Sequence, residues 1–516
     1  MKLEYETYEE AKKNFTWDER WEVFDGTRER FNIVHECIDR HPGGDTAIRI
    51  KFDDHRSETY TFDEFSRLTS RFAFFLEENG IDFGDRVALL LAPSIEFYVG
   101  MFGTFRRGAV VIPCSPLFGP DAIAFRIEKS EAKALITTKE MANLVDEGVR
   151  ENLNIIFSDE LLGKISKMKE HYEPTTKAKD LSMIQFSSGT TGAPKSILYR
   201  HGAITVAAPV VKFGIGLKND DNYFCPSSPA WGHGIWYGTI GPLIFGRALG
   251  TYSGKFDAET FLEALEEFEI TNVSAIPSHF RLVMKSEKLE NFKLKLRTFS
   301  YTGEAMPLDL FDFVKEKIGV VPHCIYGTTE VGPIALNYAG FKDWKVKPGS
   351  LGKPMVGGKE ASIIDDDGNV LPPGEEGQIA LKDDKGGWVR IGDSAYKDED
   401  GYFWYKARAD DVIISAGYTI GPIEIEEALL KHPAVEEAGV VGSPDKDRGS
   451  IVKAFVVINC EPSEQLKDEI KEFVKTRLSK HEYPKEIEFI DEIPKTPDGK
   501  IKRKILKERE IERKGG

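Results

Sequence analysis

Short apolar runs alternate with longer amphipathic segments over about the first 400 residues, and this alternation restricts the folds open to the chain. The runs Arg86–Ala92 and Val110–Cys114 are apolar at consecutive positions, so both of their faces would be buried. Between them, Ile95–Arg107 has the length and pattern of a helix that ends before Gly108. Strands buried on both faces and separated by helices are typical of parallel sheets covered by helices. The sequence therefore predicts an α/β fold.

The pattern changes after about Lys347, where turn-forming residues become frequent. Clusters such as Asp365–Asn369 and Leu371–Gly377 separate short β-rich runs, which predicts a small antiparallel sheet or β-barrel-like part. Strands and helices alternate again over the last part of the chain, roughly 100 residues long, as in a small α+β domain. We therefore expect a large N-terminal domain over residues 1–409 and a small C-terminal domain over residues 410–516.

The composition excludes some classes of protein. Of the 516 residues, 41% are hydrophobic, which is enough for large buried cores and argues against a disordered chain. The chain has 69 Lys and Arg against 85 Asp and Glu, a net charge of −16. Nucleic-acid binding needs a basic surface for phosphate contacts, so we expect no nucleic-acid partner. No apolar run approaches the roughly 20 residues that cross a bilayer, so we expect no membrane span.

The cysteines and the first residues bear on the cellular location. Five cysteines are scattered through the chain without the spacing of a disulfide framework or a zinc site. Free thiols are typical of a reducing compartment. The first residues are charged where a secretory signal peptide needs an apolar stretch. These features predict a cytoplasmic protein.

The most informative segment for function is SSGTTGAPK, which follows an apolar run at residues 183–186. Glycines let backbone N–H groups approach an anion closely, the hydroxyl groups are donors, and the lysine adds a positive charge. A flexible surface turn is the alternative, but such turns rarely follow a buried strand. We therefore predict that this loop binds a polyphosphate. Its predicted contact residues are Ser187, Ser188, Gly189, Thr190, Thr191, Gly192 and Lys195.

Three common motifs are absent from the chain: GxxxxGK(S/T), GxGxxG and GxSxG. Their absence removes the main support for a P-loop NTPase, a dinucleotide-binding dehydrogenase and an α/β-hydrolase esterase.

The SSGTTGAPK segment resembles the phosphate loop of the adenylate-forming superfamily, which includes acyl-CoA synthetases, nonribosomal adenylation domains and luciferases. Four more motifs follow in the superfamily's order: YGTTE at 326–330, RIGD at 390–393, RADD at 408–411 and PKTPDGK at 494–500. The whole chain is most similar to AMP-forming acyl-CoA synthetases of the medium-chain type. The resemblance implies two half-reactions. A carboxylic acid and ATP give an acyl-adenylate and pyrophosphate, and CoA then displaces AMP to give acyl-CoA.

The resemblance also implies roles for individual residues in ATP binding. The expected contacts of the adenine and its surroundings are Gly303, Glu304, Ala305, Tyr326, Gly327 and Thr328. Thr329 would donate a hydrogen bond to the α-phosphate, and Glu330 would bind Mg²⁺, which needs few protein ligands because it keeps waters and binds substrate phosphates. Asp393 and Arg408 match the ribose-binding positions.

The C-terminal motifs carry the remaining predicted roles. Lys500 matches the catalytic lysine that bridges the carboxylate and the α-phosphate during adenylation. In the superfamily the C-terminal domain is mobile and rotates between the half-reactions, and Asp410 matches its hinge. The expected CoA contacts are Gly417, Tyr418 and Lys475. The basic residues after Lys500 are expected to be solvated charge or an aid to phosphate binding. We also expect that a lysine acetyltransferase acts on Lys500, since acetylation removes its charge. Formation of a homo-oligomer is a separate expectation.

The acyl pocket is predicted from residue size. Its expected lining is Trp231, Gly232, His233, Thr302 and Gly327. Acetyl-CoA synthetases close this pocket with a tryptophan at the position that matches Gly327. Gly327 and Gly232 together therefore predict space for a larger acid. Each buried CH₂ group of the acid would contribute about 0.8 kcal/mol. A medium-chain, branched or aromatic acid is therefore expected. For His233, a hydrogen-bonded structural role is an equal alternative.

Two other functions are consistent with the same motifs. The enzyme could load the thiol of a separate carrier protein instead of CoA, and CoA-dependent release of AMP distinguishes the two. A catalytically silent nucleotide- or acyl-binding protein is the alternative from another class. The presence of Glu330, Asp393, Arg408 and Lys500 together argues against it.

Overall fold

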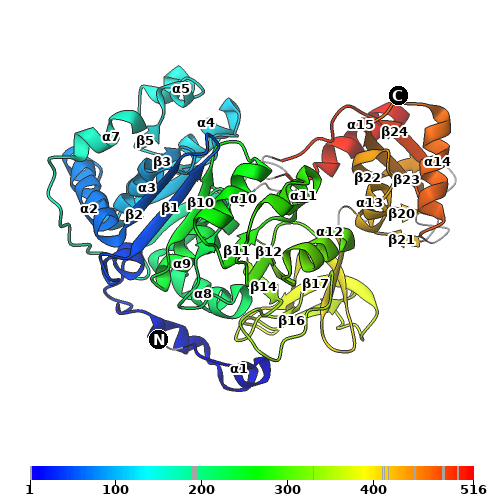
Figure 1. Ribbon diagram of the computed structural model, residues 1–516, viewed down its shortest axis with the longest axis horizontal. Helices are drawn as coiled ribbons and strands as arrows, with labels where there is room; N and C mark the ends of the chain where they lie inside the picture. The colour runs from blue at the N-terminus through cyan, green and yellow to red at the C-terminus, as the bar shows by residue number, and fades with distance from the viewer. Residues whose placement is uncertain are drawn as a thin grey trace. The chain divides into compact units, whose positions relative to one another are not determined.

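The computed structural model describes residues 3–187, 195–328, 331–408, 411, 413–415, 418–445, 449–478, 483–496 and 499–515. The chain divides into two compact units, residues 1–348 with 355–358 and residues 349–354 with 359–516. Both units contain sheets (Figure 1). The domain boundary expected at residues 409 and 410 falls inside the second unit and stays a prediction.

The first unit contains a six-stranded sheet with the order β6-β5-β3-β4-β7-β8. All its strands are parallel except β8, which is antiparallel to β7. The strands are β3 (Arg86–Leu90), β4 (Val110–Cys114), β5 (Ala134–Thr137), β6 (Asn154–Phe157), β7 (Leu181–Ser187) and β8 (Lys195–Arg200). Every residue of β4 and β5 is buried, which confirms the predicted helix-covered parallel strands.

Helix α3 (Ile95–Arg107) has the predicted bounds because both of its ends carry stop signals. The Ser94 side chain accepts a hydrogen bond from the Phe97 N–H, and Gly108 ends the helix with a φ of 79°. Its glycines permit close packing. A Cβ atom on Gly100 would lie 2.7 Å from the Leu89 side chain, and one on Gly103 would lie 2.7 Å from Phe72 of α2 (Phe62–Glu78). Helix α3 therefore sits directly between the sheet and α2.

A second sheet of the first unit has the order β14-β13-β12-β11-β9 among its strands. The strands β9 (Tyr223–Phe224), β11 (Asn272–Ala275), β12 (Thr298–Tyr301) and β13 (Pro322–Thr328) are parallel, and β14 (Gly332–Leu336) is antiparallel to β13. Helices α10 (Ala258–Glu267), α11 (Pro277–Ser286) and α12 (Leu308–Phe313) alternate with these strands along the chain. A smaller sheet pairs β1 (Thr46–Phe52) with β10 (Leu249–Ser253) and β2 (Ser57–Thr61).

The second unit begins with an antiparallel meander, drawn in yellow in Figure 1. Its strands pair in sequence order: β16 (Ala361–Ile364), β17 (Glu376–Lys382), β18 (Trp388–Lys397) and β19 (Phe403–Arg408). This is the small antiparallel sheet expected after Lys347, and its strand order is linear. A three-stranded sheet follows, with β22 (Val435–Asp445), β23 (Gly449–Ile458) and β24 (Glu486–Phe489). Helices α13 (Pro422–Leu430) and α14 (Glu464–Lys475) accompany it, as the predicted α+β pattern requires.

The basic tail after Lys500 forms helix α15 (Arg503–Gly515), which packs against β22. Lys502 and Lys504 are exposed, as expected of solvated charge, whereas the Arg503 side chain is only 14% exposed, which corrects the expectation for this residue. Leu506 lies in a small core with Val441, Phe455 and Ile493. Glu510 is fully buried and bonds to Lys453 of β23 and to Ser443 of β22. Each basic residue of the tail must therefore be considered by its own contacts.

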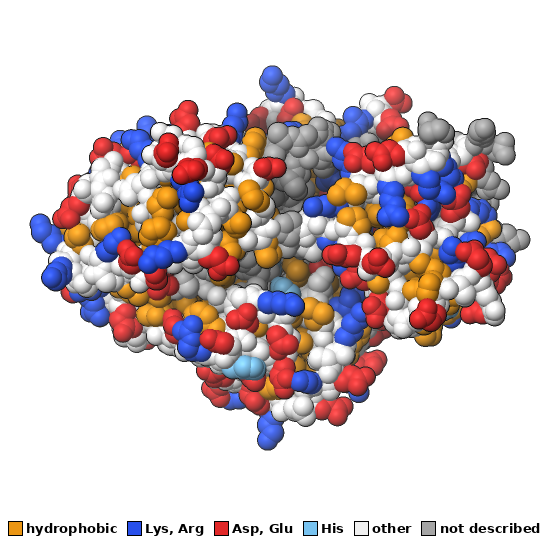
Figure 2. Space-filling view, turned by 90° about the horizontal axis from the view of Figure 1, so that it is seen from above, with side chains coloured by type: hydrophobic (Ala, Val, Ile, Leu, Met, Phe, Trp, Pro, Cys, Tyr) orange, Lys and Arg blue, Asp and Glu red, His pale blue; other side chains and the backbone are white. Residues whose placement is uncertain are grey.

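Two further observations concern the whole chain. Among the described residues, no helix is both long and apolar enough to span a bilayer. All five cysteines are free, and only Cys460 is exposed. Over the described part of the surface seen in Figure 2, Lys and Arg side chains are interspersed with Asp and Glu.

Candidate active site

The four parallel strands of the second sheet end at one edge, and most of the predicted adenine and acyl residues lie there. Because β9, β11, β12 and β13 run in the same direction, the segments at their carboxyl ends come together, where open α/β sheets bind ligands. The predicted residues at or after these ends are Trp231, Gly232, His233, Thr302, Gly303, Glu304, Ala305, Tyr326, Gly327 and Thr328. The topology thus gathers residues that are about 100 positions apart in the sequence.

Glu304 connects the segment after β12 to the beginning of α11. Its Oε1 atom accepts hydrogen bonds from the Ser278 hydroxyl at 2.5 Å and from the Ser278 N–H at 3.3 Å. Ser278 lies in the first turn of α11, where a carboxylate is favoured by the unpaired N–H groups. Gly303 has a φ of 89°, which suits glycine alone among unstrained residues. The predicted adenine wall is therefore a tight turn fixed to a helix N-terminus.

His233 is half-buried, and both of its ring nitrogens are bonded within the protein. Nδ1 lies 2.9 Å from the Ser227 hydroxyl, and Nε2 lies 2.8 Å from the Ser274 hydroxyl. The chain of bonds continues from Ser274 to Ser300 at 2.8 Å. Burial lowers the pKa of His233 to about 4, so the ring is neutral at pH 7. These contacts favour the structural alternative, because His233 joins the segment after β9 to β11 and β12.

The two glycines expected to leave space for the acid differ in their surroundings. A Cβ atom on Gly232 would meet no atom of the described residues within 4 Å. A Cβ atom on Gly327 would lie 2.3 Å from the Gly332 carbonyl oxygen, across the β13–β14 pair. The Cβ direction of Gly327 is thus occupied by backbone in this structure, and only Gly232 borders open space.

Trp231 reaches the carboxyl edge of the first sheet. Its ring meets the Phe118 ring edge-on, with centroids 5.3 Å apart, and Phe118 lies shortly after β4. The guanidinium of Arg126, in α4 (Pro120–Ser130), lies 3.9 Å from the Phe118 ring centroid. Phe118 and Arg126 belong to no motif, and their only signal in the sequence is their position after a buried strand. They were not among the predicted site residues.

The predicted phosphate loop leaves β7 at the same carboxyl edge of the first sheet. Ser187 and Lys195 are cross-strand partners in the antiparallel β7–β8 pair, so the two ends of the predicted loop lie side by side. Lys195 is exposed at the start of β8. The predicted contacts Ser188, Gly189, Thr190, Thr191 and Gly192 lie outside the described residues.

The predicted ribose pair lies in the second unit. Asp393 of β18 and Arg408 of β19 are directly opposite in the strand register. Arg408 donates a hydrogen bond to Asp393 Oδ1 at 3.1 Å, and Asp393 is only 4% exposed. A carboxylate has two acceptor oxygens, so beside its charge-assisted bond it can accept hydrogen bonds from two vicinal hydroxyl groups. This geometry is compatible with ribose binding, which stays a prediction.

Lys500 is exposed and lies at the end of a tight turn. The Lys500 N–H donates to the Thr496 hydroxyl at 3.0 Å, and the Thr496 N–H donates to the Lys500 carbonyl at 2.7 Å. Gly499 supplies a φ of 89° within this turn. On the far side, the Lys502 N–H donates to the Pro494 carbonyl at 2.8 Å. The backbone of Lys500 is therefore bonded on both sides of the residue, and its side chain is exposed.

The predicted CoA and hinge residues receive less support. Lys475 ends α14 and bonds to Glu472 of the same helix at 2.7 Å, and this bond raises the pKa of the lysine. Tyr418 begins strand β21 (Tyr418–Ile420). Thr329, Glu330, Asp410 and Gly417 lie outside the described residues. Within the described part of the chain, no group of three acidic, His or Cys side chains could hold a metal ion. The Mg²⁺ site at Glu330 stays a prediction.

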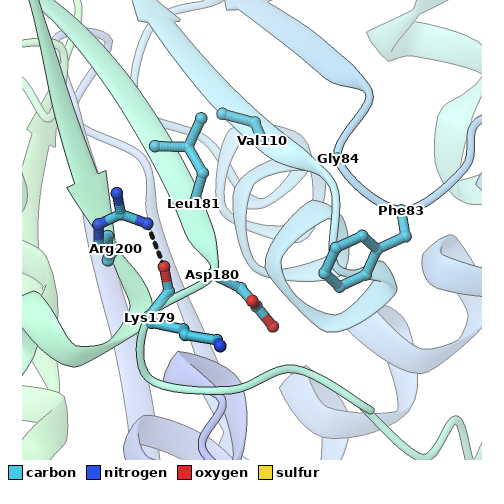
Figure 3. A pocket seen from close by; sticks show the side chains of 7 residues that line it. All are labelled: Phe83, Gly84, Val110, Lys179, Asp180, Leu181 and Arg200. Carbon is cyan, nitrogen blue, oxygen red and sulfur yellow. Dashed lines mark hydrogen bonds between the residues drawn. The ribbon is translucent and has the colours of Figure 1, made fainter.

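A hollow of about 260 Å³ opens at the opposite end of the first sheet (Figure 3). Val110 and Leu181 line it at the first residues of β4 and β7, and Arg200 lines it at the last residue of β8. In Figure 3, Arg200 donates a hydrogen bond to the Lys179 carbonyl oxygen. Because this is the amino edge of the parallel strands, the hollow is separate from the predicted site.

Comparison with known protein families decides what kind of site this is. The family described as AMP-binding enzyme matches residues 34–386. The chain belongs to this family. The family of the AMP-binding enzyme C-terminal domain matches residues 424–500. As a member of the adenylate-forming superfamily, the protein is an acid–thiol ligase, an AMP-forming acyl-CoA synthetase with ATP and CoA as co-substrates.

Individual relatives of this synthetase cover nearly the whole chain. The acetyl-coenzyme A synthetase of Bacillus subtilis strain 168 is 34% identical over 98% of this chain and 95% of its own length. The mitochondrial acyl-coenzyme A synthetase ACSM3 of Rattus norvegicus is 34% identical over 93% of this chain and 91% of its own length. The crystal structure of the anthranilate CoA ligase AuaEII with anthranoyl-AMP is 27% identical, has a TM-score of 0.85, and covers 94% of this chain and 98% of its own.

Proposed function

We propose that this acyl-CoA synthetase activates a medium-chain, branched or aromatic carboxylic acid larger than acetate. The observation that carries the proposal is Gly232, whose Cβ position meets no atom of the described residues within 4 Å beside Trp231. An open position at the predicted carboxylate pocket leaves space for carbon atoms beyond C2 of the acid. Each CH₂ group buried there would contribute about 0.8 kcal/mol to binding. Two relatives are named for acids of different size, acetate and anthranilate, and the third only for an acyl group, so the names favour no single acid.

In the first half-reaction, a carboxylate oxygen of the acid attacks the α-phosphorus of ATP, and the bond to pyrophosphate breaks. The ribose would be held by Asp393, whose Oδ1 atom accepts a hydrogen bond from Arg408 at 3.1 Å. The Lys500 ammonium would stabilise the negative charge that develops between the carboxylate and the phosphate. Mg²⁺ bound by Glu330 would neutralise negative charge on the phosphates.

In the second half-reaction, the CoA thiolate attacks the carbonyl carbon of the acyl-adenylate, and AMP leaves with the electron pair of the C–O bond. The proposed contacts of CoA are Gly417, Tyr418 and Lys475, reached after a rotation about Asp410. Lys475 would have to exchange its bond with Glu472 for a phosphate group.

A panel of carboxylic acids with ATP, Mg²⁺ and CoA tests the proposal through the release of AMP. We expect octanoate, a branched-chain acid or benzoate to exceed acetate in kcat/KM by about tenfold or more, since two buried CH₂ groups already correspond to this factor. Equal or better efficiency with acetate would refute the proposed acid class. Release of AMP without CoA, on addition of a carrier protein, would indicate the carrier-loading alternative.

The variant Gly232→Leu tests whether the open position at Gly232 borders the acyl chain. It should lower kcat/KM for the larger acids while leaving acetate within about twofold, because only the distal part of the pocket is filled. Gly163→Ala is the matched control. It is also in open space, but lies in α7 (Ser158–Ile165), after the edge strand β6. A parallel loss with all acids would show that Gly232 does not border the acyl chain.

A further inference from the structure

Four charged side chains from three segments of the second unit form one connected cluster. Arg503 of α15 binds Glu426 of α13 through two bonds, at 2.5 and 3.2 Å. Arg503 also lies 3.6 Å from Asp411, and Lys507 lies 3.1 Å from the same carboxylate. We call Asp411, Glu426, Arg503 and Lys507 the Asp411 cluster.

The Asp411 cluster is well shielded from water. The side chains of Glu426, Arg503 and Asp411 are 9%, 14% and 16% exposed. Salt therefore screens these ion pairs less than it screens pairs on the surface. Lys504 and Glu508 of the same helix are a contrasting pair, 3.8 Å apart with more than half of each side chain exposed. Exposed pairs of this kind contribute little.

The Asp411 cluster lies close in sequence to two predicted ATP-binding residues, Arg408 and Lys500. Arg503 is three residues after Lys500, and it is the first residue of α15. The Asp411 N–H donates to the Arg408 carbonyl at 2.9 Å, so in this arrangement Asp411 is bonded to the end of β19. One set of contacts thus connects Arg408, which holds Asp393, with the helix that follows Lys500.

We infer that Asp411, Arg503 and Lys507 are positioning residues that fix Lys500 relative to Arg408 for adenylation. The inference rests on the proposed function, because it assigns Lys500 to the first half-reaction. The three residues need not touch a substrate. Their loss would let α15 and the turn before it shift, and a displacement of about 1 Å can cost about a hundredfold in rate.

The test compares Asp411→Asn and Lys507→Met with Lys504→Met, which removes only the exposed pair. The first readout is ATP–pyrophosphate exchange that depends on the acid, and the second is CoA-dependent consumption of supplied acyl-adenylate. We expect the first two variants to lose about tenfold to a hundredfold in the kcat of exchange, with KM for ATP within about twofold of wild type. Consumption of acyl-adenylate should stay within about twofold, as should both activities of Lys504→Met.

Two further measurements separate positioning from misfolding. Each variant should stay folded at the assay temperature, as its thermal unfolding midpoint shows, because Arg503 keeps its two bonds to Glu426 in all of them. The double variant Asp411→Asn/Lys507→Met should be no slower in exchange than the slower single variant, because both changes break the same contact. Multiplying losses in the double variant would overturn the inference.

The outcomes also distinguish this inference from the proposed function. Equal losses in both half-reactions, or exchange at the wild-type rate in Asp411→Asn and Lys507→Met, would overturn the inference and leave the proposed function intact. Wild-type protein without acid-dependent exchange would overturn the proposed function and the inference with it.

Discussion

Lys500 is the residue predicted to stabilise the charge that develops during adenylation. Its turn is fixed by bonds to Thr496, while its side chain is exposed and can meet a substrate. We predict that Lys500→Ala lowers acid-dependent ATP–pyrophosphate exchange by about a hundredfold to a thousandfold, the usual effect of removing a group that stabilises transition-state charge. CoA-dependent consumption of supplied acyl-adenylate should change little.

The matched control for Lys500 is Lys502→Ala. Lys502 is also exposed, and its backbone N–H donates a hydrogen bond to the Pro494 carbonyl. It should keep both activities. Equal loss of both half-reactions in Lys500→Ala would show that the lysine supports the fold and not adenylation.

Individual roles could be predicted from the sequence only where a motif carries them. The partners of His233 could not be predicted, because Ser274 lies 41 residues away and becomes a neighbour only when β9 and β11 pair. The same holds for Trp231 and Phe118, which come from segments of different sheets. The space at Gly327 could not be judged either, since it depends on the backbone of β14.

At the scale of elements, boundaries with local signals were predictable. Helix α3 begins after the cap of Ser94 and ends at Gly108, and both signals are visible in the sequence. Helix α15 was missed because its basic residues conceal the positions that are buried. Leu506 and Glu510 are four residues apart on one face, and the partner of Glu510 is Lys453, far away in the sequence.

The bond between Lys453 and Glu510 supports the attachment of α15 to its sheet. Lys453 is 2% exposed and also lies 2.5 Å from Glu488 of β24. We predict that Glu510→Gln lowers the free energy of unfolding by about 3 kcal/mol, because a buried lysine loses its main counter-charge. Chemical denaturation measures this change. Glu508→Gln on the exposed side of the same helix should cost less than about 0.5 kcal/mol, and an equal loss there would contradict the argument.

The same carboxylate makes stability depend on pH. Burial opposes the charge of Glu510, but bonds from Arg513, Lys453 and Ser443 outweigh it and lower the pKa from 4.5 to about 2. A lowered pKa means that the unfolded state takes up a proton first as the pH falls. This stabilisation is complete above pH 4.5 and is lost between pH 4.5 and about 2. Glu510→Gln should therefore show a weaker dependence of unfolding free energy on pH over this interval.

At the scale of the whole molecule, the compact units and the predicted domains divide the chain at different places. The meander β16–β19 shares a unit with the C-terminal sheet, because α13 packs against β19 and Asp411 bonds to Arg408. Contacts describe one arrangement of the chain, whereas a hinge is defined by the change between two. The compact units show which segments pack together in one arrangement, and the hinge predicted at Asp410 concerns the rotation between two arrangements.

A proline at the predicted hinge can decide where the chain rotates. Proline fixes φ near −65°, so Asp410→Pro would favour the arrangement compatible with that angle and exclude the other. We predict that this variant keeps one half-reaction within about tenfold of wild type and loses the other by about a hundredfold or more, because each half-reaction needs its own arrangement. Asp410→Ala removes the same carboxylate without restricting φ and should retain both. If the proline variant keeps both half-reactions, the rotation occurs elsewhere, and the division at residues 348 and 349 is the next position to test.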